Sequence, residues 1–280
     1  MTTLMQGSVV AARMKATLEE NVVALRRKGI EPKLAVVRVG SRPDDLAYER
    51  GILKRFDGLG IAAQVFEFPE DVGREDFVSA FAAIDTSPDV HGILLFRPLP
   101  ARLDEDAIKK TIDPLKDVDG MSPFSSAKVF SGDAAGFAPC TPSAVMEMLD
   151  AYGVELAGKN VAVVGRSMVV GRPLAMLLLR RNATVTICHT KTKNMESICK
   201  NADILVAAAG KARMISPAFV SESSIVVDVG INVDDDGKLC GDVDYDAVSP
   251  VVSMISPVPG GVGAVTTSVL AKHVLKAASF

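Results

Sequence analysis

The chain has 280 residues, 48% of them hydrophobic, and a mean hydropathy of +0.26. This length exceeds the usual size of one domain, so two domains of about 100–150 residues each are expected. A formal net charge of −3 and a pI of about 5.7 argue against nucleic-acid binding, and no apolar run approaches the roughly 20 residues that a membrane span needs.

Location and metal binding can also be judged from the sequence. The N-terminal segment lacks the apolar core of a signal peptide, which predicts a cytoplasmic protein. The four cysteines lie far apart without a C-x-x-C pair, and the chain has only three histidines. Neither a disulfide framework nor a metal site is therefore expected.

Helical and strand patterns alternate through the first half of the chain. They predict helices over 9–25, 46–59 and 74–84, and buried strands over 34–40, 62–68 and 92–96. The following stretch, 113–142, is rich in Pro, Gly, Ser and Asp and is expected to be irregular connecting structure. Function tends to collect on such loops between rigid elements.

The second half continues the alternation. It predicts helices over 143–152, 172–180, near Met195 and over 266–278, and strands over 160–165, 184–188, 203–210 and 224–230. Strands that alternate with helices imply crossover connections and parallel sheets. The predicted fold class is therefore α/β.

The run VAVVGRSMVVGRP has the features of a dinucleotide-binding turn. A buried strand leads into a loop that contains Gly165, Arg166, Ser167 and Gly171, and a helix follows. Glycines permit a sharp turn and close backbone approach, and free amides at a helix N-terminus favour a pyrophosphate. The spacing G-x-S-x-x-x-G departs from G-x-G-x-x-G, so an ordinary strand-to-helix turn is the alternative.

The residues after the next strand bear on the choice of cofactor. No Asp or Glu stands there to bind the adenosine ribose hydroxyls. Arg166, Thr190 and Lys191 instead offer cationic and hydroxyl groups for a 2′-phosphate, which favours NADP, with NAD as the alternative cofactor. A solvated basic loop is the other interpretation of these residues.

Several stretches together resemble the methylenetetrahydrofolate dehydrogenase/cyclohydrolase family. They include GILL followed by RPLP, KDVDG, PCTP, GKNVAVVGRSMVVGRP, VVDVGIN and SPVPGGVGAVTT, in the family's order over nearly the whole chain. The resemblance implies a folate-binding catalytic domain over 1–142, completed by a C-terminal helix over 264–280, and a Rossmann-like NAD(P)-binding domain over 143–263. It also implies an active-site cleft between the two domains and a homodimer.

The resemblance assigns roles by position. It implies that Asp119 of KDVDG is the pterin-binding carboxylate and that Tyr48 stacks on the folate, both as catalytic residues. Without the family, an aspartate in a loop turn and a tyrosine packed near a helix start are the alternatives. The other implied contacts are Pro259, Gly260 and Gly261 for the folate, and Ile231 and Thr266 for the cofactor.

Two positions depart from the bifunctional members of that family. The bifunctional members carry a lysine four residues after the tyrosine and a glutamine before the proline-rich turn. This chain has Ile52 and Phe96 at those positions. Hydride transfer needs proximity and orientation, whereas hydrolysis of the methenyl product needs an activated water and proton transfers. The sequence therefore predicts an NADP-dependent 5,10-methylenetetrahydrofolate dehydrogenase that forms 5,10-methenyltetrahydrofolate, with weak or absent cyclohydrolase activity.

Three other interpretations remain open. A conventional bifunctional enzyme would use another group for hydrolysis, such as Arg55 or Arg97. A paralogue that binds folate or nucleotide without catalysis belongs to a different class of function. A dehydrogenase for a different small substrate is the third.

Overall fold

A computed structural model describes residues 1–234 and 236–280. The chain divides into two compact units. The six-stranded unit consists of Met1–Ala12 and Thr141–Thr266, and the three-stranded unit consists of Arg13–Cys140 and Thr267–Phe280. The predicted domains differ from this division at the N-terminus, because the first residues belong to the six-stranded unit.

The three-stranded unit is built on a small parallel sheet. Its strands are β2 (Lys33–Val39), β3 (Ala62–Phe68) and β4 (Gly92–Leu95), in the order β3-β2-β4. β2 is central and buried on both faces, which explains its unbroken apolar run. The alternating exposure along β3 fits its place at the edge of the sheet.

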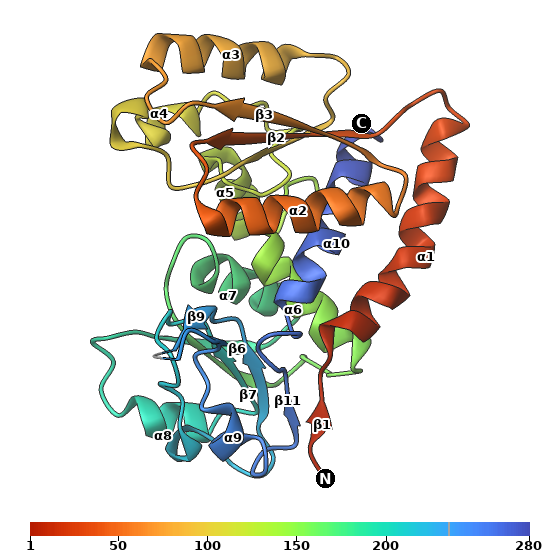
Figure 1. The fold of residues 1–280 in the computed structure, drawn as a ribbon. Coiled ribbons are helices and arrows are strands. Elements are labelled where there is room, and N and C mark those ends of the chain that lie inside the picture. The colour runs from red at the N-terminus through yellow and green to blue at the C-terminus, as the bar shows by residue number, and fades with distance from the viewer. Residues whose placement is uncertain (235) are drawn as a thin grey trace. The chain divides into compact units, whose positions relative to one another are not determined.

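Helices cover both faces of this sheet. Figure 1 shows α2 (Pro43–Asp57) and α3 (Arg74–Thr86) on opposite sides of β2 and β3. Phe77 and Phe81 of α3 belong to one core cluster with Ala35 and Val37 of β2. The apolar face that this helix shows in the sequence is thus buried against the sheet. Shorter helices follow, namely η1 (Ala101–Leu103) and α4 (Glu105–Ile108).

The segment predicted to be irregular, 113–142, contains a helix. α5 (Pro123–Ser131) begins after Ser122, whose Oγ accepts a hydrogen bond from the amide of Ser125 at 3.1 Å. A serine cap followed by proline at the first helical position is a strong start signal. The prediction was wrong here because composition was weighed above this local signal. The same segment also includes the first residues of α6 (Cys140–Ala151).

The larger sheet is parallel throughout and has the order β1-β11-β8-β7-β5-β6. β5 (Asn160–Val164) has β6 (Thr184–Cys188) on one side and β7 (Ile204–Ala207) on the other, and β8 (Ile225–Asp228) lies beyond β7. α7 (Gly171–Arg180) connects β5 to β6, and α8 (Met195–Lys200) connects β6 to β7. In such Rossmann-like sheets ligands bind where the strand order reverses, here at the carboxyl end of β5.

Short elements of this unit were not predicted. β1 (Thr3–Leu4) pairs with β11 (Met254–Ile255), and β9 (Asn232–Val233) and β10 (Leu239–Cys240) form an antiparallel pair. Two-residue strands are too short to show a period in the sequence. Two further short helices, η2 (Pro217–Phe219) and α9 (Tyr245–Val248), contribute side chains to the hydrophobic core of this unit.

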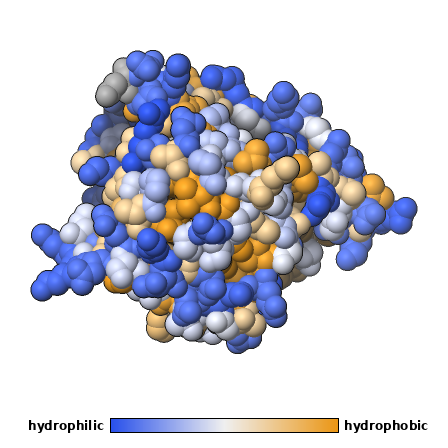
Figure 2. Space-filling model, turned by 90° about the horizontal axis from the view of Figure 1, so that it is seen from below, coloured by the Kyte–Doolittle hydropathy of each residue, from blue (hydrophilic) through white to orange (hydrophobic). Residues whose placement is uncertain are grey.

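The first helix of the chain is α1 (Gly7–Arg26) and the last is α10 (Gly263–Ala277). No helix in the described part of the chain is both long and apolar enough to cross a membrane. Figure 2 shows a face on which hydrophobic residues gather in patches bordered by hydrophilic ones.

Candidate functional site

Tyr48 and Phe96 lie together in the three-stranded unit. The tyrosine is on α2 and 37% exposed, and its ring stacks on that of Phe96 with 5.8 Å between centroids and 30° between planes. Ile52, one turn further along α2, is fully buried. At the two positions that depart from the family, Phe96 thus supports the ring of Tyr48 and Ile52 is a core side chain. Neither side chain can donate a proton.

Asp119 lies in the loop between α4 and α5. Its Oδ1 accepts a hydrogen bond from the Cys140 amide at 3.2 Å, and its Oδ2 lies 3.5 Å from Nη2 of Arg97. The carboxylate is 22% exposed and Arg97 20%, so solvent reaches this pair. Burial raises the pKa of Asp119, although the Cys140 amide and the Arg97 charge act against that shift.

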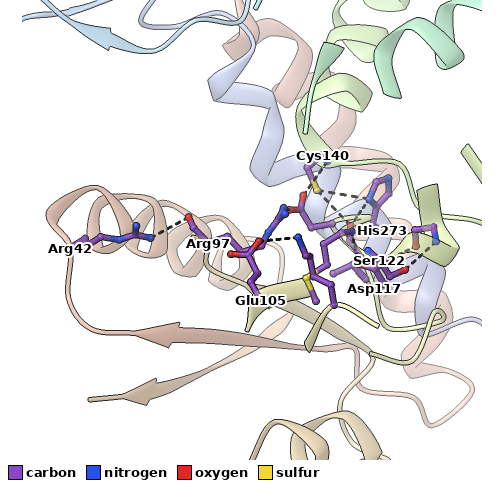
Figure 3. A network of polar contacts seen from close by, with 12 residues as sticks. Arg42, Arg97, Glu105, Asp117, Ser122, Cys140 and His273 are labelled. Carbon is purple, nitrogen blue, oxygen red and sulfur yellow. Dashed lines mark hydrogen bonds and ion pairs between the residues drawn. The ribbon is translucent and has the colours of Figure 1, made fainter. Parts of the chain in front are cut away.

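A second aspartate of KDVDG, which the sequence analysis did not single out, holds this loop. Asp117 is fully buried and accepts hydrogen bonds from the amides of Met121 and Ser122, both at 2.9 Å, and from Oγ of Ser125 at 2.6 Å. Figure 3 shows Asp117 and Ser122 within one polar network. Asp117 therefore fixes the segment that leads into α5. Asp119 lies in that segment, two residues after Asp117, so the same hydrogen bonds restrict its position.

Cys140 and His273 are neighbours in the same network (Figure 3). Nδ1 of His273 donates to the Val118 carbonyl at 2.8 Å and lies 3.9 Å from the Cys140 sulfur. Burial lowers the pKa of His273 to about 4 and raises the pKa of the Cys140 thiol well above its usual value. The imidazole is therefore neutral and the thiol protonated at neutral pH, so the pair supports the loop and is unsuited to nucleophilic catalysis.

The turn after β5 requires glycine at two positions. Gly165 has φ of 133°, and a Cβ there would lie 2.1 Å from the Ala208 carbonyl oxygen. A Cβ at Gly171 would lie 2.1 Å from the carbonyl oxygen of Gly165. Ser167 is exposed, and its Oγ accepts from the Val170 amide at 3.0 Å. The departure from G-x-G-x-x-G thus retains the close backbone packing that a dinucleotide turn needs.

The predicted 2′-phosphate cluster follows two neighbouring parallel strands. Gly165 donates its amide to the Cys188 carbonyl at 2.9 Å, which joins the carboxyl ends of β5 and β6. Arg166 follows β5, and Thr190 and Lys191 follow β6, all three exposed. Among the described residues neither cation has an ion-pair partner. Both charges are thus available to an anion at the same edge of the sheet.

A cavity of about 250 Å³ lies within the six-stranded unit. Its lining includes Ile231 and, from the SPVPGGVG loop, Pro259, Gly260 and Gly261. The structure therefore brings together residues that the sequence analysis assigned to folate and to cofactor. Thr266 is buried, and its hydroxyl donates to the Gly263 carbonyl at 3.0 Å, so only its oxygen lone pairs remain for a ligand.

Two buried aspartates beside this cavity went unnoticed in the sequence. Asp228, which lines it, accepts from the amides of Gly230 and Val243, both at 2.9 Å. Asp242 accepts from the amides of Gly210 and Lys211, also at 2.9 Å. Burial raises the pKa of Asp228 to about 6. These carboxylates fix the loops that follow β7 and β8. Asp228 is the aspartate of VVDVGIN, and Asp242 follows Gly241 in the sequence GDVD.

No cluster of three or more His, Cys, Asp or Glu side chains suited to a metal ion occurs in residues 1–234 and 236–280. Any anion bound after β5 would therefore rely on backbone amides, hydroxyls and the cations described above.

Two family models match the chain. The tetrahydrofolate dehydrogenase/cyclohydrolase catalytic domain matches residues 5–119, and the NAD(P)-binding domain of the same family matches residues 139–280. Asp119 is the last residue of the first match, and the Gly165 turn and the cavity lie within the second.

Whole proteins give the same result. The bifunctional protein FolD of Clostridioides difficile is 54% identical over 274 residues, which are 98% of this chain and 96% of that protein. The crystal structure of the bifunctional enzyme FolD from Campylobacter jejuni has a TM-score of 0.96 at 39% identity, covering 100% of this chain and 99% of that one. The Trypanosoma brucei enzyme, complexed with NADP cofactor and inhibitor, has a TM-score of 0.93 at 34% identity, covering 99% and 97%.

Proposed function

Because the chain belongs to the tetrahydrofolate dehydrogenase/cyclohydrolase family, we propose that it oxidises 5,10-methylenetetrahydrofolate with NADP to 5,10-methenyltetrahydrofolate. The observation that carries this proposal is Asp119, a solvent-accessible carboxylate on a loop that a buried aspartate and histidine hold in place. A carboxylate can accept paired hydrogen bonds from the amino-pyrimidine edge of a pterin. The Gly165 turn supports the second ligand, a dinucleotide.

Each group has a distinct part in this reaction. NADP, when bound, supplies the acceptor for the two electrons and the hydrogen that leave the methylene carbon. The amides at the start of α7 would hold the pyrophosphate, Asp119 would hold the pterin, and Tyr48 would stack on it. The lone pair of a folate nitrogen forms the new carbon–nitrogen double bond, so the chain's residues need only bind and orient the reactants.

Cofactor preference is the first testable consequence. We expect Arg166→Ala and Lys191→Ala each to raise the KM for NADP by about 10-fold or more, since each removes a charged hydrogen bond to the 2′-phosphate. The KM for NAD should change little. Steady-state kinetics with both cofactors measures this, with Lys193→Ala, another exposed cation of the same loop, as the matched control. Equal losses with NAD would reject the phosphate assignment.

Two observations point in opposite directions on cyclohydrolase activity, the second activity of the family. The relatives named above are described as bifunctional, which favours a chain that also hydrolyses the methenyl product over one that does not. The local structure supports slow hydrolysis, because Ile52 is fully buried and Phe96 is stacked on Tyr48. If hydrolysis is efficient, a group other than these two must hold the attacking water, and Arg97 beside Asp119 is the first candidate to donate a hydrogen bond to it. Its guanidinium stays protonated, so Arg97 would position the water and would not remove its proton.

The rate at which the protein hydrolyses methenyltetrahydrofolate distinguishes a dehydrogenase without cyclohydrolase activity from a bifunctional enzyme. With Ile52 and Phe96 in place of protic groups, the purified protein should hydrolyse added methenyltetrahydrofolate no faster than buffer does. Ile52→Lys with Phe96→Gln should then restore hydrolysis, and Ile52→Lys alone should restore less, because an unsupported buried lysine is misplaced or neutral. Ile52→Met is the control for a long side chain without charge. Hydrolysis well above the buffer rate in the unmodified protein would establish the bifunctional reading.

The remaining properties stay predictions. The substrate partner is a small-molecule folate, with no nucleic acid or membrane involved, and the chain is expected to form a cytoplasmic homodimer. A protein that bound folate but reduced neither dinucleotide would instead be a non-catalytic paralogue.

A further inference from the structure

We propose that Arg97 is a specificity-determining residue of the folate site, which together with Asp119 selects pterins that carry a 4-oxo group. The inference rests on the proposed function, because it takes Asp119 as the pterin-binding carboxylate. Arg97 would donate to the 4-oxo oxygen while Asp119 accepts from the neighbouring N–H groups.

The structure holds the Arg97 side chain beside that carboxylate. Its Nη2 lies 3.5 Å from Oδ2 of Asp119. Its turn is anchored on both sides, because Arg42 donates to the Arg97 carbonyl at 3.2 Å and Glu105 accepts from the Leu99 amide at 3.0 Å (Figure 3). The guanidinium is thus placed by the backbone that carries it and by the ion pair.

Most of the guanidinium's hydrogen-bonding capacity is unused. Within the described part of the chain, Asp119 is the one residue that accepts a hydrogen bond from this side chain. A guanidinium has five N–H donors in a fixed planar fork. Both partners are about one-fifth exposed, so a ligand can reach the remaining donors of Arg97 and the remaining lone pairs of Asp119.

The pair matches one edge of an oxidised or reduced 2-amino-4-oxo pterin. That edge presents, in order, the 2-amino donor, the N3–H donor and the 4-oxo acceptor. A carboxylate followed by a guanidinium presents two acceptors and then donors, which is the complementary order. A 4-amino pterin places a donor opposite the guanidinium and has no hydrogen on N3, so it meets an unfavourable contact at both residues.

Direct binding of two probes tests this assignment. Folic acid carries the 4-oxo group, and its 4-amino-4-deoxy analogue carries an amino group at the same position. We expect the unmodified protein to prefer folic acid, and Arg97→Leu to reduce the ratio of the two dissociation constants by about 10-fold, the effect of one charged hydrogen bond. Some preference should remain, because Asp119 also distinguishes the two rings. Arg97→Lys keeps the charge and a donor and should retain part of the lost selectivity.

Three controls make the outcome decisive. Arg74→Leu removes an exposed arginine that pairs with Asp104 in the same unit, and should leave the ratio unchanged. Affinity for NADP and the melting temperature report whether Arg97→Leu folds normally. An unchanged ratio, or equal weakening of both probes, overturns the role of Arg97 while Asp119→Ala can still support the proposed function. Failure of the unmodified protein to bind either probe overturns both.

Discussion

Asp119→Ala is expected to weaken folate binding by about 10- to 100-fold and to leave NADP binding nearly unchanged. The substitution removes a charged hydrogen-bond acceptor, and such a loss typically costs on the order of 1.5–3 kcal/mol. Asp119 belongs to the three-stranded unit, whereas the Gly165 turn belongs to the six-stranded unit. Titration calorimetry with folic acid and, separately, with NADP measures the two affinities.

The matched variants separate charge from structure. Asp119→Asn keeps an oxygen that can accept from the Cys140 amide but removes the charge, so an intermediate loss is expected. Asp133→Ala, an exposed aspartate of the same unit, should change neither affinity. Similar losses for folate and NADP in Asp119→Ala would mean that this residue acts on the structure of the chain and does not recognise folate.

Asp117→Ala should destabilise the three-stranded unit by about 3 kcal/mol or more and should also abolish tight folate binding. The buried carboxylate accepts from two amides and one hydroxyl, and its loss leaves all three donors without a partner. Each buried donor left unsatisfied costs about 1–3 kcal/mol. The loop that carries Asp119 would lose its anchor at the same time.

Urea unfolding followed by circular dichroism tests this second prediction. Asp117→Asn retains one acceptor oxygen and should fall between the alanine variant and the unmodified chain. Asp106→Ala removes a highly exposed aspartate and is expected to change stability by no more than about 0.5 kcal/mol. If Asp117→Ala unfolds at the same urea concentration as this control, the carboxylate does not hold the loop as described.

The sequence by itself determined the fold class and the main helices and strands. Their periods are local properties, so the buried run of β2 and the apolar face of α3 could be read from a few neighbouring residues. The turn at Gly165 was also readable, because strand, glycine and helix follow one another directly. The family was indicated by its motifs, and the comparisons confirmed it.

The tertiary structure decided which distant residues meet. β1 pairs with β11, about 250 positions away in the sequence. The first residues therefore belong to the six-stranded unit, and no local sequence pattern indicated this. The roles of Asp117 and of the Arg97–Asp119 pair likewise depend on hydrogen bonds that a sequence does not record. A sequence window measures propensity and period, whereas a binding site depends on where separate loops are held in space, and that is fixed by long-range packing.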